Sequence, residues 1–151
     1  MCNKVVLTNM VMVEDPHTGR VLVQDRKKSW KGLSFPGGHV EGESLVDSAI
    51  REVKEETGLT VCNLKACGVV HWLDLDSQDR YLVFLYKTNT FQGQLIELHD
   101  EGQNKWMTLD EFRHAPSEND AVKYLPLFLE SDYSEAFGAW RDKEPYELVY
   151  K

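Results

Sequence analysis

The chain has 151 residues, of which 42% are hydrophobic and 28% are charged, a balance typical of one compact domain with a buried core. Its formal net charge of −8 repels polyanions and argues against non-specific binding to nucleic acid. No apolar run approaches the ~20 residues of a membrane-spanning helix, and the N-terminus lacks the pattern of a secretion signal, so no membrane partner is expected. The composition predicts a single domain over residues 1–151, and its charge allows a small anionic substrate if divalent ions neutralise the acidic side chains first.

The three cysteines, Cys2, Cys62 and Cys67, are odd in number, which favours free thiols in a reducing, cytoplasmic compartment. Cys62, Cys67 and His71 lie near one another in sequence and raise the question of a zinc site. Their spacing is loose and a fourth ligand is missing, so we interpret the two thiols as core or half-buried side chains.

The first half of the chain predicts a pair of strands and then a helix. Residues 5–13 read as a strand, and residues 20–25 alternate well enough to be its partner across a turn. Ser44, with Asp47 three residues on, is typical of a helix N-terminus, and Gly58 is typical of a helix end. Between them, apolar residues recur at helical spacing. They are Leu45, Val46, Ala49, Ile50 and Val53.

The middle of the chain is rich in β-forming residues. Residues 64–75 and 81–88 are separated by a polar turn, so we expect them to form a hairpin. Residues 105–108 read as a short strand, after which Thr108 caps one helical turn over residues 109–112.

The last third of the chain predicts a second main helix over residues 119–130, bent or broken before Pro126 because proline removes a helical hydrogen bond. Residues 146–150 read as an edge strand. Strands combined with two main helices indicate an α+β sandwich.

The predicted helix carries Glu52, Glu55 and Glu56 at positions i, i+3 and i+4, so their carboxylates project from one face. A lone acidic cluster would be read as a solvated surface, since like charges so placed destabilise a helix by about 0.2–0.5 kcal/mol per pair. Here Arg51 lies beside them and can pair with one glutamate, fixing its rotamer. The cluster is therefore a candidate site.

The loop before this helix adds Glu41 and Glu43 to the acidic cluster. An oxygen-rich ligand set suits Mg²⁺ or Mn²⁺ rather than zinc. Pro36 holds the preceding chain extended, and Gly37 and Gly38 allow the backbone to approach a bulky anion. A metal-bridged nucleotide fits such a site better than a nucleic-acid groove does.

Together these residues match the Nudix box, G-x5-E-x7-R-E-U-x-E-E-x-G-U with U aliphatic, from Gly37 to Leu59 without a departure. The chain thus resembles a Nudix hydrolase over roughly residues 4–130. The resemblance implies a mixed sheet between helices and metal-assisted attack of water on the phosphorus of a nucleoside diphosphate derivative. The last twenty residues have no counterpart in the resemblance.

Residues 99–107 are similar to the E-G-Q-x-x-x-W-M segment of the MutT-type members, which remove 8-oxo-dGTP from the nucleotide pool. The similarity implies that Glu101 assists with metal and water, with Glu97 as a nearby competitor. Residues 115–119 resemble the proline-containing element before the final helix of the same members, which implies that Asn119 pairs with the oxidised base, although Asn119 is also well placed as a helix cap. Arg26 and Phe35 match positions that line the base pocket.

The resemblance thus gives three sets of site residues. The catalytic set is Arg51, Glu55, Glu56 and Glu101. The metal set is Gly37, Glu52, Glu55, Glu56 and Glu101. The substrate-binding set is Arg26, Phe35, Gly37, Gly38 and Asn119.

Other branches of the family fit less well. Members that act on ADP-ribose usually carry a proline where Asp74 and Leu75 stand, and those acting on dinucleoside polyphosphates a tyrosine where Asp76 and Ser77 stand. The acyl-coenzyme A signature is also absent. Non-catalytic binding modules of this fold usually lose box glutamates, which are all present here. These alternatives stay open, as does the choice between a monomer and a homodimer.

Overall fold

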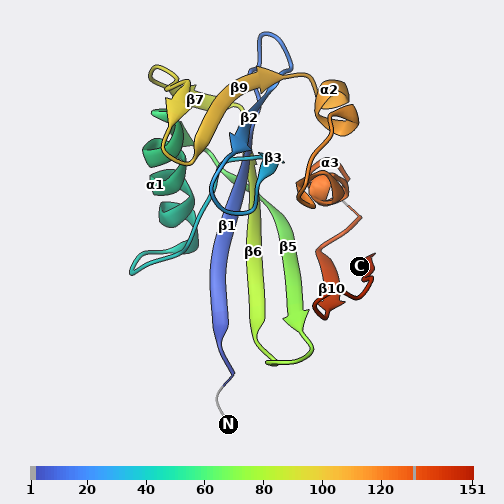
Figure 1. Cartoon of the computed structure of the whole chain (residues 1–151). Coiled ribbons are helices and arrows are strands. Elements are labelled where there is room, and N and C mark those ends of the chain that lie inside the picture. Colours follow the sequence, from blue (N-terminus) through green and yellow to red (C-terminus); the bar gives the residue numbers. More distant parts are fainter. Residues whose placement is uncertain (1–2, 131) are drawn as a thin grey trace.

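The computed structural model describes residues 3–130 and 132–151, so Cys2 lies outside the described residues. It places two larger β-sheets side by side, with helices on opposite sides of them (Figure 1). No helix among these residues is both long and apolar enough to cross a membrane. The mixed sheet with few helices confirms the predicted α+β class.

The larger sheet is mixed, with the strand order β1-β6-β5-β10-β11 in the described residues. β1 and β6 run parallel, as do β5 and β10, whereas the other neighbours are antiparallel. The predicted hairpin is confirmed as β5 and β6, and the predicted edge strand as β11; β10 was not predicted. The strands are β1 (Val5–Val13), β5 (Lys65–Asp74), β6 (Arg80–Thr88), β10 (Glu135–Trp140) and β11 (Leu148–Tyr150).

The second sheet has the order β3-β2-β9-β8, and a short pair joins β4 to β7. The prediction that residues 20–25 pair with residues 5–13 is therefore wrong, because β2 pairs with β3 and β9 whereas β1 pairs with β6. The strand predicted over residues 105–108 begins earlier, because β9 pairs with β2 along its whole length, and it ends before Thr108. The strands are β2 (Val21–Arg26), β3 (Gly32–Ser34), β4 (Thr60–Cys62), β7 (Thr90–Gln92), β8 (Leu98–His99) and β9 (Gly102–Met107).

Helix α1 (Leu45–Thr57) confirms the predicted boundaries. The Ser44 hydroxyl accepts a hydrogen bond from the Asp47 N–H at 3.0 Å, which satisfies one of the free N–H groups at the helix start. Gly58 adopts φ 81°, in the left-handed region that favours glycine, and its N–H donates to Lys54.

The helices after β9 differ in length from the prediction, one being longer and the other divided. Helix α2 (Leu109–His114) is capped by Thr108 as predicted and extends two residues further. The helix predicted over residues 119–130 is divided into a 3₁₀ turn, η1 (Ala121–Tyr124), and helix α3 (Leu125–Leu129). The break before Pro126 is confirmed, and Pro126 lies in the first turn of α3, where it costs no hydrogen bond.

Strand β1 separates two hydrophobic cores because its side chains alternate between the faces of the sheet. Val11 and Val13 pack with the apolar face of α1, whereas Met10 and Met12 pack with the residues of η1 and α3. The predicted arrangement of sheet between helices is therefore confirmed.

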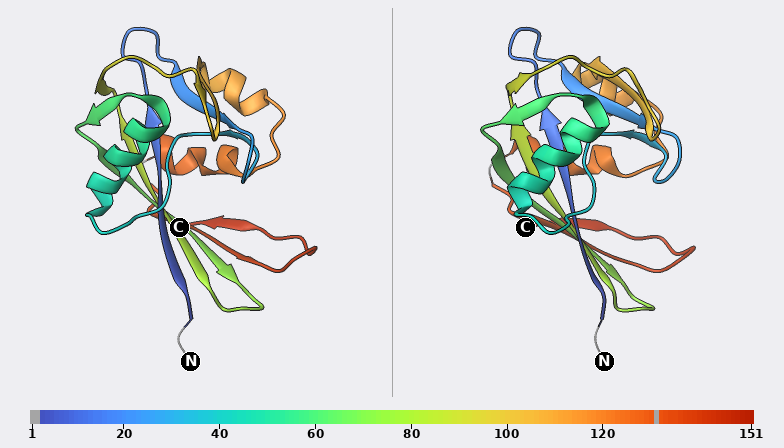
Figure 2. Two further views of the ribbon diagram at one scale, coloured as in Figure 1. Left: turned by 60° about the vertical axis from the view of Figure 1, so that its left-hand side comes forward. Right: turned by 90° about the vertical axis from the view of Figure 1, so that its left-hand side faces the viewer.

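The larger sheet extends beyond the layer of helices. Figure 2 shows the turn between β5 and β6 and the hairpin of β10 and β11 projecting away from the helical half of the molecule. The sheet face between these projections and the helices contributes one side of a cavity.

Candidate active site

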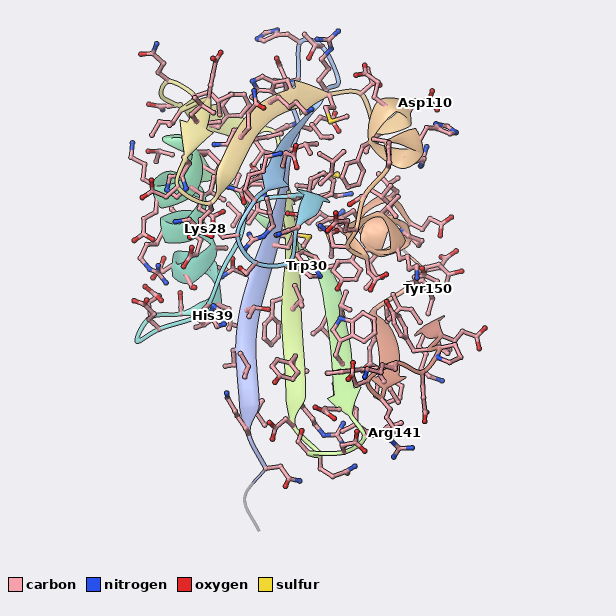
Figure 3. The ribbon with its side chains drawn as sticks, viewed as in Figure 1. Lys28, Trp30, His39, Asp110, Arg141 and Tyr150 are labelled. Carbon is pink, nitrogen blue, oxygen red and sulfur yellow. The ribbon has the colours of Figure 1, made fainter. Side chains whose placement is uncertain are left out.

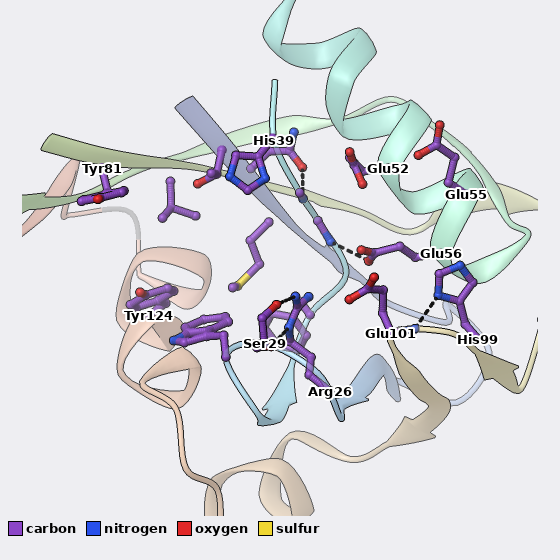
Figure 4. Close-up of a pocket in the computed structure, with 18 of the residues that line it drawn as sticks. Arg26, Ser29, His39, Glu52, Glu55, Glu56, Tyr81, His99, Glu101 and Tyr124 are labelled. Atoms are coloured by element: carbon purple, nitrogen blue, oxygen red, sulfur yellow. Dashed lines mark hydrogen bonds between the residues drawn. The ribbon is translucent and has the colours of Figure 1, made fainter. Parts of the chain in front are cut away.

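A cavity of about 680 Å³ lies between α1, β1, the segment from β2 to β3, and the projecting part of the larger sheet. Its two ends differ in chemistry. In Figure 4 the labelled glutamates lie on one side of the close-up and Tyr81 and Tyr124 on the other, with His39 between them. The acidic residues are Glu52, Glu55, Glu56 and Glu101, and the aromatic residues are Trp30, Phe35, Trp72, Tyr81 and Tyr124.

Arg51 does not line the cavity but holds the glutamates around it. Its guanidinium lies 2.8 Å from the carboxylate of Glu43, 2.9 Å from that of Glu52 and 3.3 Å from that of Glu55. The hydrogen bond from Arg51 lowers the pKa of Glu43 to about 2 and raises the pKa of Arg51 itself. The predicted pairing is thus confirmed, with three carboxylates rather than one.

Glu56 is the buried carboxylate of the site, with 7% of its surface exposed. Burial raises its pKa to about 7, despite a hydrogen bond from the Gly37 N–H to its Oε2 at 3.2 Å. Its backbone is also fixed, because Nδ2 of Asn104 donates to the Glu56 carbonyl at 2.8 Å. The fold therefore fixes the position of Glu56 and, by burying its carboxylate, disfavours the charged form.

The structure gives a reason of packing for Gly37 and Gly38, both of which line the cavity. A Cβ at Gly37 would lie 2.0 Å from the carbonyl oxygen of Asn9 on β1. A Cβ at Gly38 would lie 2.4 Å from the carboxylate of Glu52. The two glycines therefore let the loop cross β1 and leave room for a carboxylate, whether or not an anion is also bound.

Glu101, from the turn between β8 and β9, lines the cavity, and its N–H donates to Nδ1 of His99 at 3.1 Å. Glu97 is not among the lining residues. The placement of the two residues favours Glu101 as the auxiliary acid. His99 and His39 also line the cavity and were not predicted, since neither belongs to a spacing that indicates a site.

Arg26 and Phe35 line the cavity as expected from the resemblance. The guanidinium of Arg26 donates to the Ser29 carbonyl at 3.0 Å and to Oε1 of Gln24 at 3.3 Å. Phe35 is stacked on Phe112 with ring centroids 4.9 Å apart, so its ring is held in a fixed position in the lining of the cavity.

Asn119 is not among the lining residues. Its Oδ1 accepts a hydrogen bond from the Ala121 N–H at 2.9 Å, in the turn that leads into η1, but the N-cap of η1 is Asp120 and not Asn119 as the sequence also allowed. Its Nδ2 donates to the carbonyls of Trp30 and Lys31 at 3.3 and 3.2 Å. Both ends of the amide thus hold the protein backbone, and a direct contact between Asn119 and a base stays a prediction without support from this geometry.

The aromatic end was not predicted apart from Phe35, because its members come from distant strands. Trp30 stacks on Tyr124 with centroids 6.2 Å apart, and Trp72 donates its indole N–H to the Tyr124 hydroxyl at 3.0 Å. Trp30 adopts φ 50°, an unusual conformation for a bulky residue, which the hydrogen bond from Asn119 helps to hold.

The acidic end has the donors for a divalent cation, although no group of three acidic, histidine or cysteine side chains within residues 3–130 and 132–151 is arranged to hold one. Arg51 draws Glu52 and Glu55 toward itself, whereas Glu56 is bonded to Gly37. Burial raises the pKa of Glu52 as well as that of Glu56. Two carboxylates whose charged form is disfavoured by burial, beside the carboxylates of Glu55 and Glu101, offer the oxygen ligands that suit Mg²⁺ or Mn²⁺, and His39 and His99 line the same cavity.

Comparisons with known proteins agree with this geometry. Residues 5–128 match the family model described as NUDIX domain. An uncharacterized Nudix hydrolase, YvcI, of Bacillus subtilis is 30% identical over 114 residues, which cover 73% of this chain and 70% of that protein. An oxidized purine nucleoside triphosphate hydrolase of Danio rerio is 29% identical over 130 residues, covering 82% and 80%.

Two further matches mark the range of the similarity. The crystal structure of a MutT protein from Bacillus halodurans superposes with a TM-score of 0.74 at 24% identity, covering 97% of this chain and 96% of that one. An ADP-ribose pyrophosphatase of Methanocaldococcus jannaschii is 28% identical over 92 residues, or 60% of this chain and 54% of that protein. Proteins similar to this chain are therefore named for different substrates, oxidized purine nucleoside triphosphates in one case and ADP-ribose in another.

Proposed function

Since this chain belongs to the Nudix hydrolase family, we propose that it hydrolyses nucleoside triphosphates to the monophosphate and pyrophosphate. The observation that carries the proposal is the single cavity with a carboxylate cluster at one end and aromatic rings at the other. The phosphates of a nucleotide need a cation, and its base needs a flat apolar surface. One cavity offers both.

The acidic end would hold the cation through Glu52, Glu55, Glu56 and Glu101, together with the backbone of Gly37. A divalent ion bound there neutralises phosphate charge and lowers the pKa of an attacking water, for which we propose the β-phosphorus as target. Arg51 keeps the carboxylates of Glu52 and Glu55 at the cavity edge. Asn104 and the Gly37 N–H hold Glu56 in place from its two ends.

We propose 8-oxo-dGTP as the preferred substrate, in a cytoplasmic nucleotide pool. Its support is the similarity to an oxidized purine nucleoside triphosphate hydrolase along 82% of this chain and the stacking surface at the aromatic end. Arg26, which lines the cavity, is the first candidate to pair with the base edge. Asn119 would act through Trp30 instead.

A second candidate is another nucleoside diphosphate derivative, such as ADP-ribose. It has the support of the shorter similarity to an ADP-ribose pyrophosphatase and of a cavity long enough to separate its acidic and aromatic ends. A purely binding role has less support, since Glu52, Glu55 and Glu56 are all in place around the cavity.

The test is a parallel screen in Mg²⁺ of 8-oxo-dGTP, the ordinary dNTPs, ADP-ribose and diadenosine polyphosphates, comparing kcat/KM. We expect 8-oxo-dGTP to give the highest value, with pyrophosphate as product. A higher value for ADP-ribose would move the assignment to the second candidate. Tight nucleotide binding without turnover of any compound would instead favour the binding role.

A further inference from the structure

The hairpin of β10 and β11 lies outside residues 5–128, the part of the chain that matches the family model, yet it packs against Trp72, which lines the cavity. Strand β10 pairs with β5 in parallel, and Gly138 stands opposite Trp72 in the register. The far end of the hairpin is also anchored: Arg141 lies 2.9 Å from the Asp76 carboxylate, beside the turn between β5 and β6 (Figure 3).

The indole of Trp72 packs directly against Gly138. A Cβ at Gly138 would lie 2.5 Å from Cζ3 and 2.7 Å from Cε3 of Trp72, so the ring lies directly on the glycine backbone. Both contacts involve a large rigid ring, which cannot bend away as a flexible side chain could. Gly138 does not have a positive φ, so its absence of a side chain reflects this contact rather than the backbone conformation.

Tyr146, in the turn of the same hairpin, holds Trp72 from another side. Its ring meets the indole edge to face, with centroids 5.3 Å apart at 87°. The Tyr146 hydroxyl donates to Asp120, the residue before η1, and Asp120 pairs with Lys123 at 3.1 Å. The hairpin is thus tied to the helical side of the cavity.

The third constraint on Trp72 comes from the cavity wall, because its indole N–H donates to the Tyr124 hydroxyl at 3.0 Å. Tyr124 in turn stacks with Trp30. The indole of Trp72 is thus held by the backbone of Gly138, by the ring of Tyr146 and by a hydrogen bond to Tyr124. It therefore presents one fixed surface to the cavity that it lines. Such rigidity lowers the entropic cost of holding a flat ligand.

We propose that the β10–β11 hairpin determines substrate specificity by fixing Trp72, which forms the stacking surface for the planar group attached to the phosphates. Gly138 and Tyr146 are positioning residues, and Trp72 is the residue that touches the ligand. The proposal rests on the proposed function, and it adds that residues outside the family match decide which planar group is held best.

The test uses the full-length protein with Mg²⁺ and three variants, Gly138→Ala, Tyr146→Ala and Tyr146→Phe. Gly138→Ala displaces the indole, and Tyr146→Ala removes its edge contact, so each should raise KM for 8-oxo-dGTP and dGTP by about tenfold, the loss expected for one disturbed base–aromatic stack. The kcat should change by less than about twofold, since the reacting phosphorus lies at the other end of the cavity. The rise should be smaller for dCTP, whose ring offers less area for stacking.

Tyr146→Phe keeps the ring and should change KM little. Val149→Ala is the matched control: Val149 is an exposed residue of β11 that pairs with Phe137, so its change tests the hairpin without touching Trp72. Inhibition by inorganic pyrophosphate, which has no ring, should be unchanged in all variants. Unfolding temperatures show whether each variant folds. If Gly138→Ala does not fold, the comparison of Tyr146→Ala with Tyr146→Phe tests the inference by itself.

An unchanged KM in Gly138→Ala and Tyr146→Ala would overturn the inference. So would a parallel loss of pyrophosphate inhibition, because the hairpin would then support the whole cavity without selecting a ring. The proposed function fails separately, through a wild-type protein that hydrolyses none of the nucleotides.

Discussion

Glu56 combines two properties that conflict at the scale of a single residue. The helix and the Gly37 N–H place its carboxylate at the acidic end of the cavity, where a cation would be bound, while its burial raises its pKa to about 7. The nearby Glu55 is largely exposed, with 57% of its side chain accessible, and is held by Arg51 instead. The two glutamates are therefore held in different ways: Glu56 is buried, whereas Glu55 is exposed and ion-paired with Arg51.

Changing either Glu55 or Glu56 to glutamine should lower kcat by roughly two decades or more, comparable with losing a principal electrostatic stabiliser. Each substitution preserves shape and removes the charge that the cation requires. The fold should survive, because like-charge repulsion on α1 decreases. Steady-state kinetics with 8-oxo-dGTP and circular dichroism are the measurements. A tenfold or smaller loss would mean that the cation is held by other residues.

The raised pKa of Glu56 also predicts how stability varies with pH in the metal-free protein. Below the ordinary value of 4.5 the group is protonated in both the folded and unfolded states, and folding carries no penalty. Between 4.5 and about 7 the unfolded chain ionises while the folded chain does not, so the free energy of unfolding falls by about 3 kcal/mol on account of this residue.

The measurement is denaturant unfolding of wild type and Glu56→Gln in metal-free buffer at several pH values. Glutamine has no charge to lose, so the variant should gain about 3 kcal/mol relative to wild type as the pH rises from 4.5 to 7. The shift of Glu43 in the opposite direction is common to both proteins and cancels. Parallel stability curves for the two proteins would contradict the prediction.

At the scale of elements, Asn119 joins η1 to the segment that carries Trp30. We expect Asn119→Ala to raise KM for 8-oxo-dGTP and for dGTP by similar factors, because the amide holds the Trp30 and Lys31 carbonyls rather than lining the cavity. Stability should fall by about 1 kcal/mol with the loss of the hydrogen bonds of the Asn119 side chain. The measurement is KM for both substrates. A rise in KM for 8-oxo-dGTP alone would contradict this prediction and would instead support a direct contact between Asn119 and the oxidised base.

The elements that could be predicted from sequence are those whose signals are local. Ser44 and Gly58 mark both ends of α1, and the alternation of β2 and the polar turn after β5 are visible without any partner. The missed strands, such as β3 and β10, are short or partly polar, and their conformation follows from pairing with β2 and β5. Tertiary pairing, which a single sequence does not display, decides them.

The same distinction applies to the site. Glu52, Glu55 and Glu56 of the acidic end could be predicted because they lie within one helix at fixed spacing, whereas Glu101 was predicted only from the similarity of residues 99–107 to the MutT-type members. The aromatic end depends on Trp30, Trp72 and Tyr124, which are separated by about forty to fifty residues and meet only when β5 packs beside η1. Substrate preference therefore depends on the part of the cavity that sequence patterns reveal least.

At the scale of the whole molecule, the net charge of −8 would repel a nucleotide unless a cation is bound first. We expect hydrolysis to require Mg²⁺ or Mn²⁺ and to stop in excess EDTA. The same cation should stabilise the folded chain by mass action, because the unfolded chain has no assembled site. Full turnover in EDTA would contradict both the cation requirement and the role given to the acidic end.

This stabilisation by metal should itself depend on pH. A cation binds the ionised form of Glu56, whose pKa lies at about 7, so binding must displace a proton at pH 6 but not at pH 8. The rise in unfolding temperature on adding Mg²⁺ should therefore be larger at pH 8 than at pH 6. In Glu56→Gln the rise should be smaller and nearly independent of pH, since the displaced proton is absent. Thermal unfolding of both proteins with and without Mg²⁺ tests this, and an equal rise at the two pH values in wild type would place the cation away from Glu56.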